Sequence, residues 1–229
     1  MIKKVLGKLA DGYDLSFKES KDSMTAIMRG EATPAQISCF LTALKMKGET
    51  IDEISAFAQT MREFCNRITP NVNGRLVDTC GTGGDRVNTF NISTVSAFVV
   101  AGANVSIAKH GNRSVTSKCG SADVLENLGL NLALKPADVE ALIEKIGIGF
   151  IYAPAFHPAM KHAIGPRREL GISTIFNILG PLTNPADADA QLLGVFDPRL
   201  TEPLAQTLMA LGCEEAMVVH ATDAHEGGL

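Results

Sequence analysis

The stretch Leu76-Val77-Asp78-Thr79-Cys80-Gly81-Thr82-Gly83-Gly84-Asp85 joins a short apolar run to a glycine-rich loop. Glycine has no Cβ, so such a loop lets backbone N–H groups come close to a bound phosphate and can take positive φ angles. A strand followed by this loop indicates an α/β protein with a ligand at the carboxyl edge of its sheet. A tight turn without a ligand has the same composition, and the loop alone does not decide between them.

The segments that follow this stretch alternate between β-like and helical patterns. The expected strands are 76–79, 105–108, 130–133, 148–153, 191–196 and 216–220, and the expected helices are 94–101, 122–128, 137–146 and 202–211. This alternation predicts an α/β fold with a mostly parallel central sheet flanked by helices. Ligands of such sheets bind at the loops after the strands.

The residues before the glycine loop show helical spacing only. Thr33-Pro34 places an N-cap before a proline in the first turn, and Thr50-Ile51-Asp52-Glu53 is a capping box. The segment 154–185 is rich in proline and glycine and is too long for a structureless loop, so we expect a helix near 157–163. We predict a small helical domain over 1–69, with part of 155–190 packing back on it, and an α/β domain over 70–229.

Composition limits the function classes. The 229 residues include 21 basic and 25 acidic side chains, for a net charge of -4, which argues against a nucleic-acid partner. No apolar run reaches the ~18–20 residues of a membrane span, and the first residues lack a signal-peptide pattern, so a cytoplasmic protein without a membrane partner is expected. The five cysteines are scattered and are expected to be reduced thiols.

Two further turns carry groups suited to an anion. Ser93 and Thr94 are expected to open a helix, whose N-terminus attracts negative charge, although plain N-capping explains them equally well. The segment Lys109-His110-Gly111-Asn112-Arg113 directly follows an expected strand and brings two cations. Lys109 suits a phosphate as a point charge, and its alternative role is a solvated surface cation.

Two smaller signals accompany these turns. Ser121, in Gly120-Ser121-Ala122-Asp123, caps the next helix or binds a ligand oxygen. Asp78 and Asp85 flank the first loop, and Asp85 suits ribose hydroxyls or a metal held through water, whereas local turn bonding explains both residues as well. Several anion-suited turns at the ends of adjacent strands favour a phosphorylated ligand more than any one of them does.

Seven motifs stand in one order along the chain: GTGGD, NIST, KHGNR, GSAD, HPAMK, PRRELG and GPLTNP. In this order and spacing the sequence resembles the anthranilate phosphoribosyltransferase family of tryptophan biosynthesis. The resemblance implies transfer of the phosphoribosyl group from phosphoribosyl pyrophosphate to the amine of anthranilate, with release of pyrophosphate. It also implies Mg2+ as the cofactor and a homodimer formed through the N-terminal helices.

The resemblance also implies roles for individual residues. The ligands of phosphoribosyl pyrophosphate would be Gly81, Gly84, Asp85, Asn91, Ser93, Thr94, Lys109 and Ser121, with Ser93 also contacting the metal. Anthranilate would contact Gly81, His110, Asn112, His157, Arg167 and Pro181. No side chain is expected to act as nucleophile or base. Without the resemblance, Arg167 would be interpreted as part of a salt bridge with Glu169, and His157 as an ordinary residue at a helix start.

The sequence departs from the family pattern near its end. The family carries an adjacent Asp-Glu pair that binds magnesium after the strand expected at 216–220. The acids found there, Asp223 and Glu226, are not adjacent. We expect the pair to follow Leu229, which makes this chain a C-terminal truncation and leaves its own catalytic competence open.

Three alternatives to this transferase remain at this stage. A pyrimidine nucleoside phosphorylase has a similar helical plus α/β plan and a glycine-rich phosphate loop. A non-catalytic relative that binds nucleic acid would need a local basic patch. In the third alternative, the chain acts only as a dimerising or folding unit through its helical domain.

Overall fold

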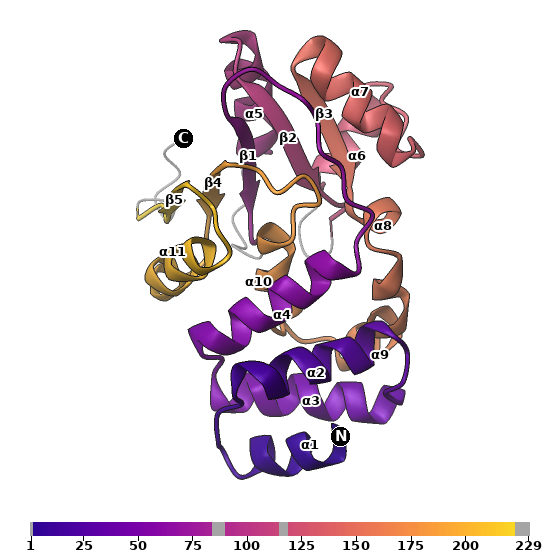
Figure 1. Ribbon diagram of the computed structural model, residues 1–229, viewed down its shortest axis with the longest axis vertical. Coiled ribbons are helices and arrows are strands. Elements are labelled where there is room, and N and C mark those ends of the chain that lie inside the picture. Colours follow the sequence, from indigo (N-terminus) through magenta and orange to yellow (C-terminus); the bar gives the residue numbers. More distant parts are fainter. Residues whose placement is uncertain (1, 84–89, 115–118, 223–229) are drawn as a thin grey trace. The chain divides into compact units, whose positions relative to one another are not determined.

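The structure is a computed structural model that describes residues 2–83, 90–114 and 119–222 (Figure 1). The chain divides into two compact units, one made of residues 1–66 and 157–183 and the other of residues 67–156 and 184–229. Among the described residues, no helix has both the length and the apolar character needed to cross a membrane.

The helical unit is built from two separate parts of the chain. Its first part contains α1 (Ile2–Ala10), α2 (Phe17–Met28), α3 (Pro34–Lys47) and α4 (Ile51–Glu63). Its second part contains η1 (Pro158–Met160), α9 (Lys161–Leu170), α10 (Phe176–Leu179) and η2 (Gly180–Leu182). The segment 157–183 therefore packs with the N-terminal helices, and α9 contacts both α2 and α3.

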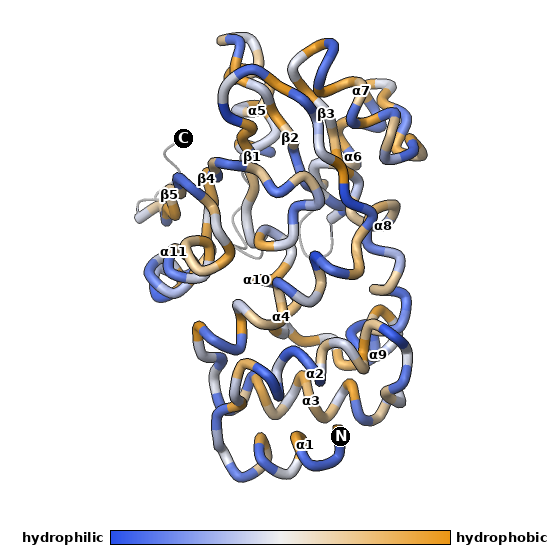
Figure 2. The backbone as a smooth tube through the Cα atoms, viewed as in Figure 1, coloured by the Kyte–Doolittle hydropathy of each residue, from blue (hydrophilic) through white to orange (hydrophobic). Residues whose placement is uncertain are grey.

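Capping and an aromatic core explain the helical unit. Thr33 and Thr50 each accept a hydrogen bond from the backbone three residues on, which confirms the two predicted helix starts. Phe40 of α3 and Phe57 of α4 are fully buried and meet edge to face, with ring centroids 5.7 Å apart. Polar and apolar residues alternate along these helices in Figure 2, as expected for helices that bury one face.

The α/β unit holds a five-stranded sheet. Its strands are β1 (Leu76–Gly81), β2 (Ser106–Gly111), β3 (Ile148–Tyr152), β4 (Ala190–Gly194) and β5 (Glu215–Val219). All pairs are parallel, in the order β3-β2-β1-β4-β5. The chain thus builds outward from β1 through β2 to β3 and then crosses to β4 on the other side of β1. The strand order reverses between β1 and β4, which is where sheets of this kind bind ligands.

Helices cover this sheet. They are α5 (Ile92–Gly102), α6 (Ser121–Asn127), α7 (Pro136–Ile146), α8 (Ala153–Phe156), η3 (Pro198–Leu200) and α11 (Thr201–Ala210). One core cluster unites Leu76 of β1, Ile151 of β3 and Ile143 of α7, all buried. At the edge of the sheet, α11 lies beside β5 (Figure 1).

Two details of the sequence-based prediction are wrong. Residues 130–133 form turns instead of a strand, because the side chain of Asn131 accepts a hydrogen bond from the Ala133 backbone at 2.9 Å and closes an Asx turn. Lys109 and His110 lie inside β2, because this strand continues to Gly111 and pairs with β3 along that length. The main helix of the segment 157–183 begins at Lys161, after a short 3-10 turn that Pro158 starts.

Candidate functional site

The glycine loop begins where β1 and β4 end together. Gly81 is paired with Gly194, and the Thr82 N–H donates to the Gly194 carbonyl at 3.0 Å. A Cβ on Gly81 would lie 3.3 Å from that carbonyl oxygen, a tight contact. The predicted loop therefore leaves the sheet at its switch point. Gly84 and Asp85, which the sequence places in the loop, lie outside the described residues.

The N-terminus of α5 lies beside β1. Asn91 precedes this helix without a side-chain capping bond, and the Ser93 carbonyl accepts a hydrogen bond from the Thr79 hydroxyl at 2.8 Å. Thr94 is 3% exposed, and its hydroxyl has no hydrogen-bond partner among the described residues. Buried hydroxyls are usually bonded, so this one suggests a partner supplied by a ligand.

Lys109 extends from β2 toward the same helix end. It is 3% exposed, and its Nζ donates to the Thr79 carbonyl at 2.6 Å and to Ser93 Oγ at 3.1 Å. No carboxylate oxygen of the described residues lies within 4 Å of this ammonium group. Burial lowers the pKa of Lys109, and the negative charge of Asp78 opposes that shift. Lys109 is therefore a buried cation without a directly paired anion among the described residues, and not a solvated surface cation.

A second pair of glycines holds the neighbouring turns together. A Cβ on Gly111 would lie 2.4 Å from Ser121 Oγ, and a Cβ on Gly120 would lie 2.3 Å from the Ser114 backbone nitrogen. Ser121 Oγ donates to the Asn112 carbonyl at 3.2 Å. The structure thus brings Ser121 and Asn112 together, and α6 begins at Ser121 as predicted within one residue.

Arg113 does not belong with the anion-suited groups. Its guanidinium makes two hydrogen bonds of 2.7 Å to Glu126 and one of 3.1 Å to Asp123. Those bonds, first of all the ones to Glu126, raise the pKa of Arg113. The expectation of two available cations in this turn is wrong, because two carboxylates from α6 already bind the second one.

Asp78 was interpreted from the sequence only as a flanking acid, and its observed role is different. It is fully buried in β1; Oδ1 accepts a hydrogen bond from the His110 N–H at 3.2 Å, and Oδ2 accepts one from Asn184 Nδ2 at 2.8 Å. Burial raises the pKa of Asp78 to about 6, although Lys109 and the hydrogen bonds act in the opposite direction. These bonds exclude local turn bonding as the role of Asp78. The one feature of the sequence that pointed to a buried role was the position of an acid within an apolar strand.

His157, Arg167 and Pro181 all lie in the helical unit. His157 is buried just before η1, and burial lowers its pKa to about 4, a shift that a hydrogen bond with the Thr183 backbone only partly offsets. The imidazole is therefore neutral near pH 7. Pro181 is buried in η2, and the next carbonyl, that of Leu182, accepts a hydrogen bond from Arg62 Nε at 2.8 Å.

Arg167 is a half-buried cation in the last turn of α9. Its guanidinium carbon lies 5.0 Å from the centroid of the Phe176 ring, and burial lowers its pKa. No carboxylate of the described residues lies within 4 Å of it, so the salt bridge with Glu169 is not formed. Arg167 and Lys109 share one property: among the described residues, no carboxylate is paired with either positive charge.

Metal ligands are scarce in the described part of the chain. It contains no group of three His, Cys, Asp or Glu side chains that could hold a metal ion. Ser93 Oγ, the predicted metal contact, accepts the hydrogen bond from Lys109 described above. Asp223 and Glu226 lie outside the described residues. All five cysteines are thiols outside any disulfide, as expected.

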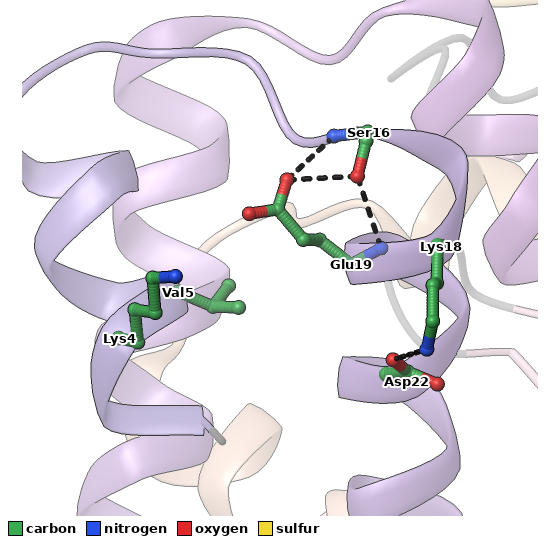
Figure 3. Close-up of a pocket in the computed structure, with 6 residues that line it drawn as sticks. All are labelled: Lys4, Val5, Ser16, Lys18, Glu19 and Asp22. Atoms are coloured by element: carbon green, nitrogen blue, oxygen red, sulfur yellow. Dashed lines mark hydrogen bonds and ion pairs between the residues drawn. The ribbon is translucent and has the colours of Figure 1, made fainter.

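A cavity of about 380 Å³ lies in the helical unit beside α1 and α2 (Figure 3). Its lining residues are Lys4, Val5, Ser16, Lys18, Glu19 and Asp22. Its polar groups bind one another: Glu19 bonds Ser16 in the capping box, and Lys18 pairs with Asp22 at 2.6 Å. The cavity includes no predicted site residue.

Comparison with known proteins identifies the family. Residues 3–65 match the glycosyl transferase family, helical bundle domain, and residues 73–227 match the glycosyl transferase family, a/b domain. The chain is 60% identical over 223 residues to the anthranilate phosphoribosyltransferase of Acetivibrio thermocellus, covering 97% of this chain and 64% of that protein. It is 58% identical to the one from Methanocorpusculum labreanum, covering 96% and 65% of the two chains.

Solved structures agree with this match. The anthranilate phosphoribosyltransferase of Thermus thermophilus has a TM-score of 0.89 at 44% identity, covering 97% of this chain and 66% of that one. The Saccharomyces cerevisiae enzyme in complex with PRPP and Mg has a TM-score of 0.88 at 28% identity, covering 95% and 64%. The chain thus spans about two thirds of the length of these relatives. It belongs to the glycosyl transferase family that combines a helical bundle domain with an a/b domain, and within that family it is similar to anthranilate phosphoribosyltransferases.

Proposed function

We propose that the protein transfers the phosphoribosyl group of phosphoribosyl pyrophosphate to anthranilate, a step of tryptophan biosynthesis that releases pyrophosphate. The observation that carries the proposal is Lys109: its ammonium group is almost fully buried at the carboxyl edge of the sheet, beside a helix N-terminus, and no carboxylate of the described residues is paired with it. Burying a cation without a counterion is costly, and a diphosphate would supply the missing negative charge.

The chemistry requires little more than positioning and charge stabilisation. An aromatic amine is neutral at physiological pH, so no strong base is needed to generate the nucleophile. The difficult step is the departure of pyrophosphate from the ribose carbon, which cations and N–H donors directed at the diphosphate would favour. We propose that its binding residues are Gly81, Gly84, Asp85, Asn91, Ser93, Thr94, Lys109 and Ser121.

Arg167 is the proposed partner of the anthranilate carboxylate. Its planar guanidinium suits a carboxylate, and it has no paired acid of its own among the described residues. His157, neutral near pH 7, and the buried Pro181 belong to the same compact unit and are proposed to contact the aromatic ring.

Magnesium is the proposed cofactor, because a similar yeast enzyme is described in complex with PRPP and Mg. Mg2+ binds through carboxylates, substrate phosphates and water. The described residues contain no group of three His, Cys, Asp or Glu side chains that could hold a metal ion, and Ser93 is the contact that the family resemblance implies. We therefore propose that the diphosphate and water hold most of the ion, with Ser93 as one contact.

The first test of this function is binding. Isothermal titration of the chain with phosphoribosyl pyrophosphate and Mg2+ should show saturable binding at one site. Turnover is tested by the consumption of anthranilate, which is followed by its fluorescence, in this chain and in a version extended past Leu229. Release of base from thymidine or uridine with phosphate, and no anthranilate consumption by either form, would replace the proposal with a nucleoside phosphorylase. Salt-sensitive retention on single-stranded DNA would favour a nucleic-acid-binding relative.

The proposed assembly is a homodimer formed through the N-terminal helices. Sedimentation analysis should give twice the mass of one chain, 24.3 kDa each. A single species at the monomer mass across micromolar concentrations would contradict it.

A further inference from the structure

The ladder between β1 and β2 stops before either strand ends. Its paired residues are Leu76 with Ser106 and Val77 with Ile107, whereas β1 continues to Gly81 and β2 to Gly111. On their outer sides both strands stay paired to the end, β1 with β4 and β2 with β3. The two central strands therefore reach their carboxyl ends without the backbone pairs that would fix their spacing.

Side chains join the strands where this ladder is missing. Asp78 Oδ1 accepts from the His110 N–H, and Asn184 Nδ2 donates both to Asp78 Oδ2 and to the Ala108 carbonyl, at 2.8 Å each. Asp78 thus holds the backbone on one side of Lys109, and Asn184 holds the backbone on the other side.

The orientation of the Asn184 amide is determined by its neighbours. Its Oδ1 accepts a hydrogen bond from the Ala186 N–H at 2.9 Å, so the Nδ2 end must face Asp78 and Ala108. A flipped amide would place the Nδ2 donor against the Ala186 N–H and the Oδ1 acceptor against the Asp78 carboxylate. Both residues are buried, so water does not replace these bonds easily.

The connection bears on Lys109 because of strand alternation. Asp78 and Cys80 point to one face of β1 and Thr79 to the other, where the Thr79 hydroxyl bonds Ser93 of α5. Lys109 reaches this second face and bonds the Thr79 carbonyl and Ser93. The bonds from Asp78 and Asn184 therefore hold the segment of β2 that carries Lys109 from the face opposite its ammonium group.

We propose that Asp78 and Asn184 are positioning residues for the transfer reaction: they replace the missing ladder and fix the place of the Lys109 ammonium group at the diphosphate. Neither residue touches the substrate. This inference rests on the proposed function, since it concerns the binding of the diphosphate by Lys109.

Exchanges of amide and carboxylate test the pair, and of these variants only the double one conserves the net charge. In Asp78→Asn, an amide group faces the donor of Asn184, and in Asn184→Asp two carboxylates face each other. The double variant Asp78→Asn with Asn184→Asp restores one donor and one acceptor between the two positions, but leaves the Ala108 carbonyl without its donor. Each single variant should bind phosphoribosyl pyrophosphate with Mg2+ about 10-fold more weakly, and the double variant should recover part of that loss.

Two further measurements separate positioning from general stability. Hydrogen exchange of the His110 amide should be slow in the wild type and about 10-fold faster in Asp78→Asn, with exchange in α7 unchanged. Ile143→Val removes a buried methyl group from the core of the same unit and serves as the stability control, with unchanged affinity. If Asn184→Asp does not fold, Asn184→Ser removes the same donors without adding a charge.

The possible outcomes test the positioning role of Asp78 and Asn184 separately from the proposed phosphoribosyl transfer. Wild-type affinity in folded Asp78→Asn and Asn184→Ser, or a His110 amide that exchanges freely in the wild type, would overturn the positioning role and leave the proposed function intact. A wild-type chain that does not bind phosphoribosyl pyrophosphate in this form or in the extended form would overturn both.

Discussion

Two buried lysines, one in each unit, are bonded in opposite ways. The side chain of Lys47 is 5% exposed, and its ammonium group binds Asp14 at 2.7 Å, Glu53 at 2.9 Å and the Gly48 carbonyl at 2.6 Å. The whole residue Lys109 is 3% exposed, and among the described residues its ammonium group binds a carbonyl and a hydroxyl. Burial lowers the pKa of both groups, but the two carboxylates outweigh it and raise the pKa of Lys47, whereas that of Lys109 stays lowered.

This contrast separates a cation that stabilises the fold from a cation that is available to a ligand. Two carboxylates of the fold pair directly with Lys47, whereas no carboxylate of the described residues lies within 4 Å of the Lys109 ammonium group. The arginines repeat the contrast, since Arg113 binds Glu126 and Asp123 whereas Arg167 has no described carboxylate within 4 Å. Burial alone does not make the distinction; the presence of a paired acid does.

The largest effect should come from replacing Lys47, the lysine that pairs with two carboxylates. Lys47→Met leaves Glu53, which is fully buried, with two backbone donors but no cation, and should lower the free energy of unfolding by about 3–5 kcal/mol. Urea denaturation followed by circular dichroism measures this. Lys18→Met, which breaks an exposed pair with Asp22, is the control and should cost less than about 1 kcal/mol. Equal losses in the two variants would remove the contrast.

A pH titration tests another buried side chain, His157, because burial disfavours the charged form of its imidazole. The folded-state pKa of His157, about 4, lies below its ordinary value of 6.5, so its contribution to stability is complete above pH 6.5 and is lost as the pH falls toward 4. The loss should reach up to about 3 kcal/mol, from ~1.4 kcal/mol per pKa unit. His157→Gln should flatten this part of the stability curve, measured by urea denaturation from pH 7 to 4. An unchanged slope would show that His157 is not the titrating group.

Replacing Lys109, which has no carboxylate of the described residues within 4 Å, should affect ligand binding more than stability. Lys109→Met should weaken binding of phosphoribosyl pyrophosphate with Mg2+ about 10- to 100-fold, because a hydrogen bond to a charged group contributes ~1.5–3 kcal/mol. Titration calorimetry measures the affinity, and Lys18→Met again serves as the control. If Lys109→Met binds like the wild type, the buried ammonium group is structural after all.

The smallest effect concerns Arg167, the arginine that has no carboxylate of the described residues within 4 Å. Arg167→Lys keeps the charge but loses the planar guanidinium stacked on Phe176, and should weaken anthranilate binding about 10-fold, or ~1.4 kcal/mol, with little change for phosphoribosyl pyrophosphate. Fluorescence titration with anthranilate and calorimetry with the other ligand separate the two. Equal losses for both ligands would contradict a role specific to the carboxylate.

Local signals predicted much of the fold. The capping residues Thr33 and Thr50 lie three residues from the groups they bind, so the sequence contains each complete interaction, and both helix starts were predicted. The alternating segments likewise predicted five of the strands. The extra strand at 130–133 failed because three apolar residues do not specify a strand when the Asn among them, Asn131, closes a turn.

Long-range pairing explains what the sequence did not predict in the site. Asp78 and Asn184 are 106 positions apart, and nothing near Asp78 in the sequence distinguishes its bond to Asn184 from turn bonding. Arg113 was interpreted as an available cation because its acids, Asp123 and Glu126, lie on the next helix and make contact only after the chain turns back. Residue types at strand ends were predictable, but which charges remain unpaired was not.

The glycines of the turn before α6 also limit how this protein can be altered by engineering. Gly120 has no room for any side chain, because the nearest atom is backbone that cannot rotate away, whereas a Cβ on Gly102 would meet nothing within 4 Å. A saturation library should therefore accept many residues at Gly102 and almost none at Gly120, even in a selection for folded protein that ignores ligand binding. Gly120 belongs to one of the turns interpreted above as suited to an anion, so packing alone would maintain part of that turn, and the residue would survive in a descendant that no longer binds phosphate.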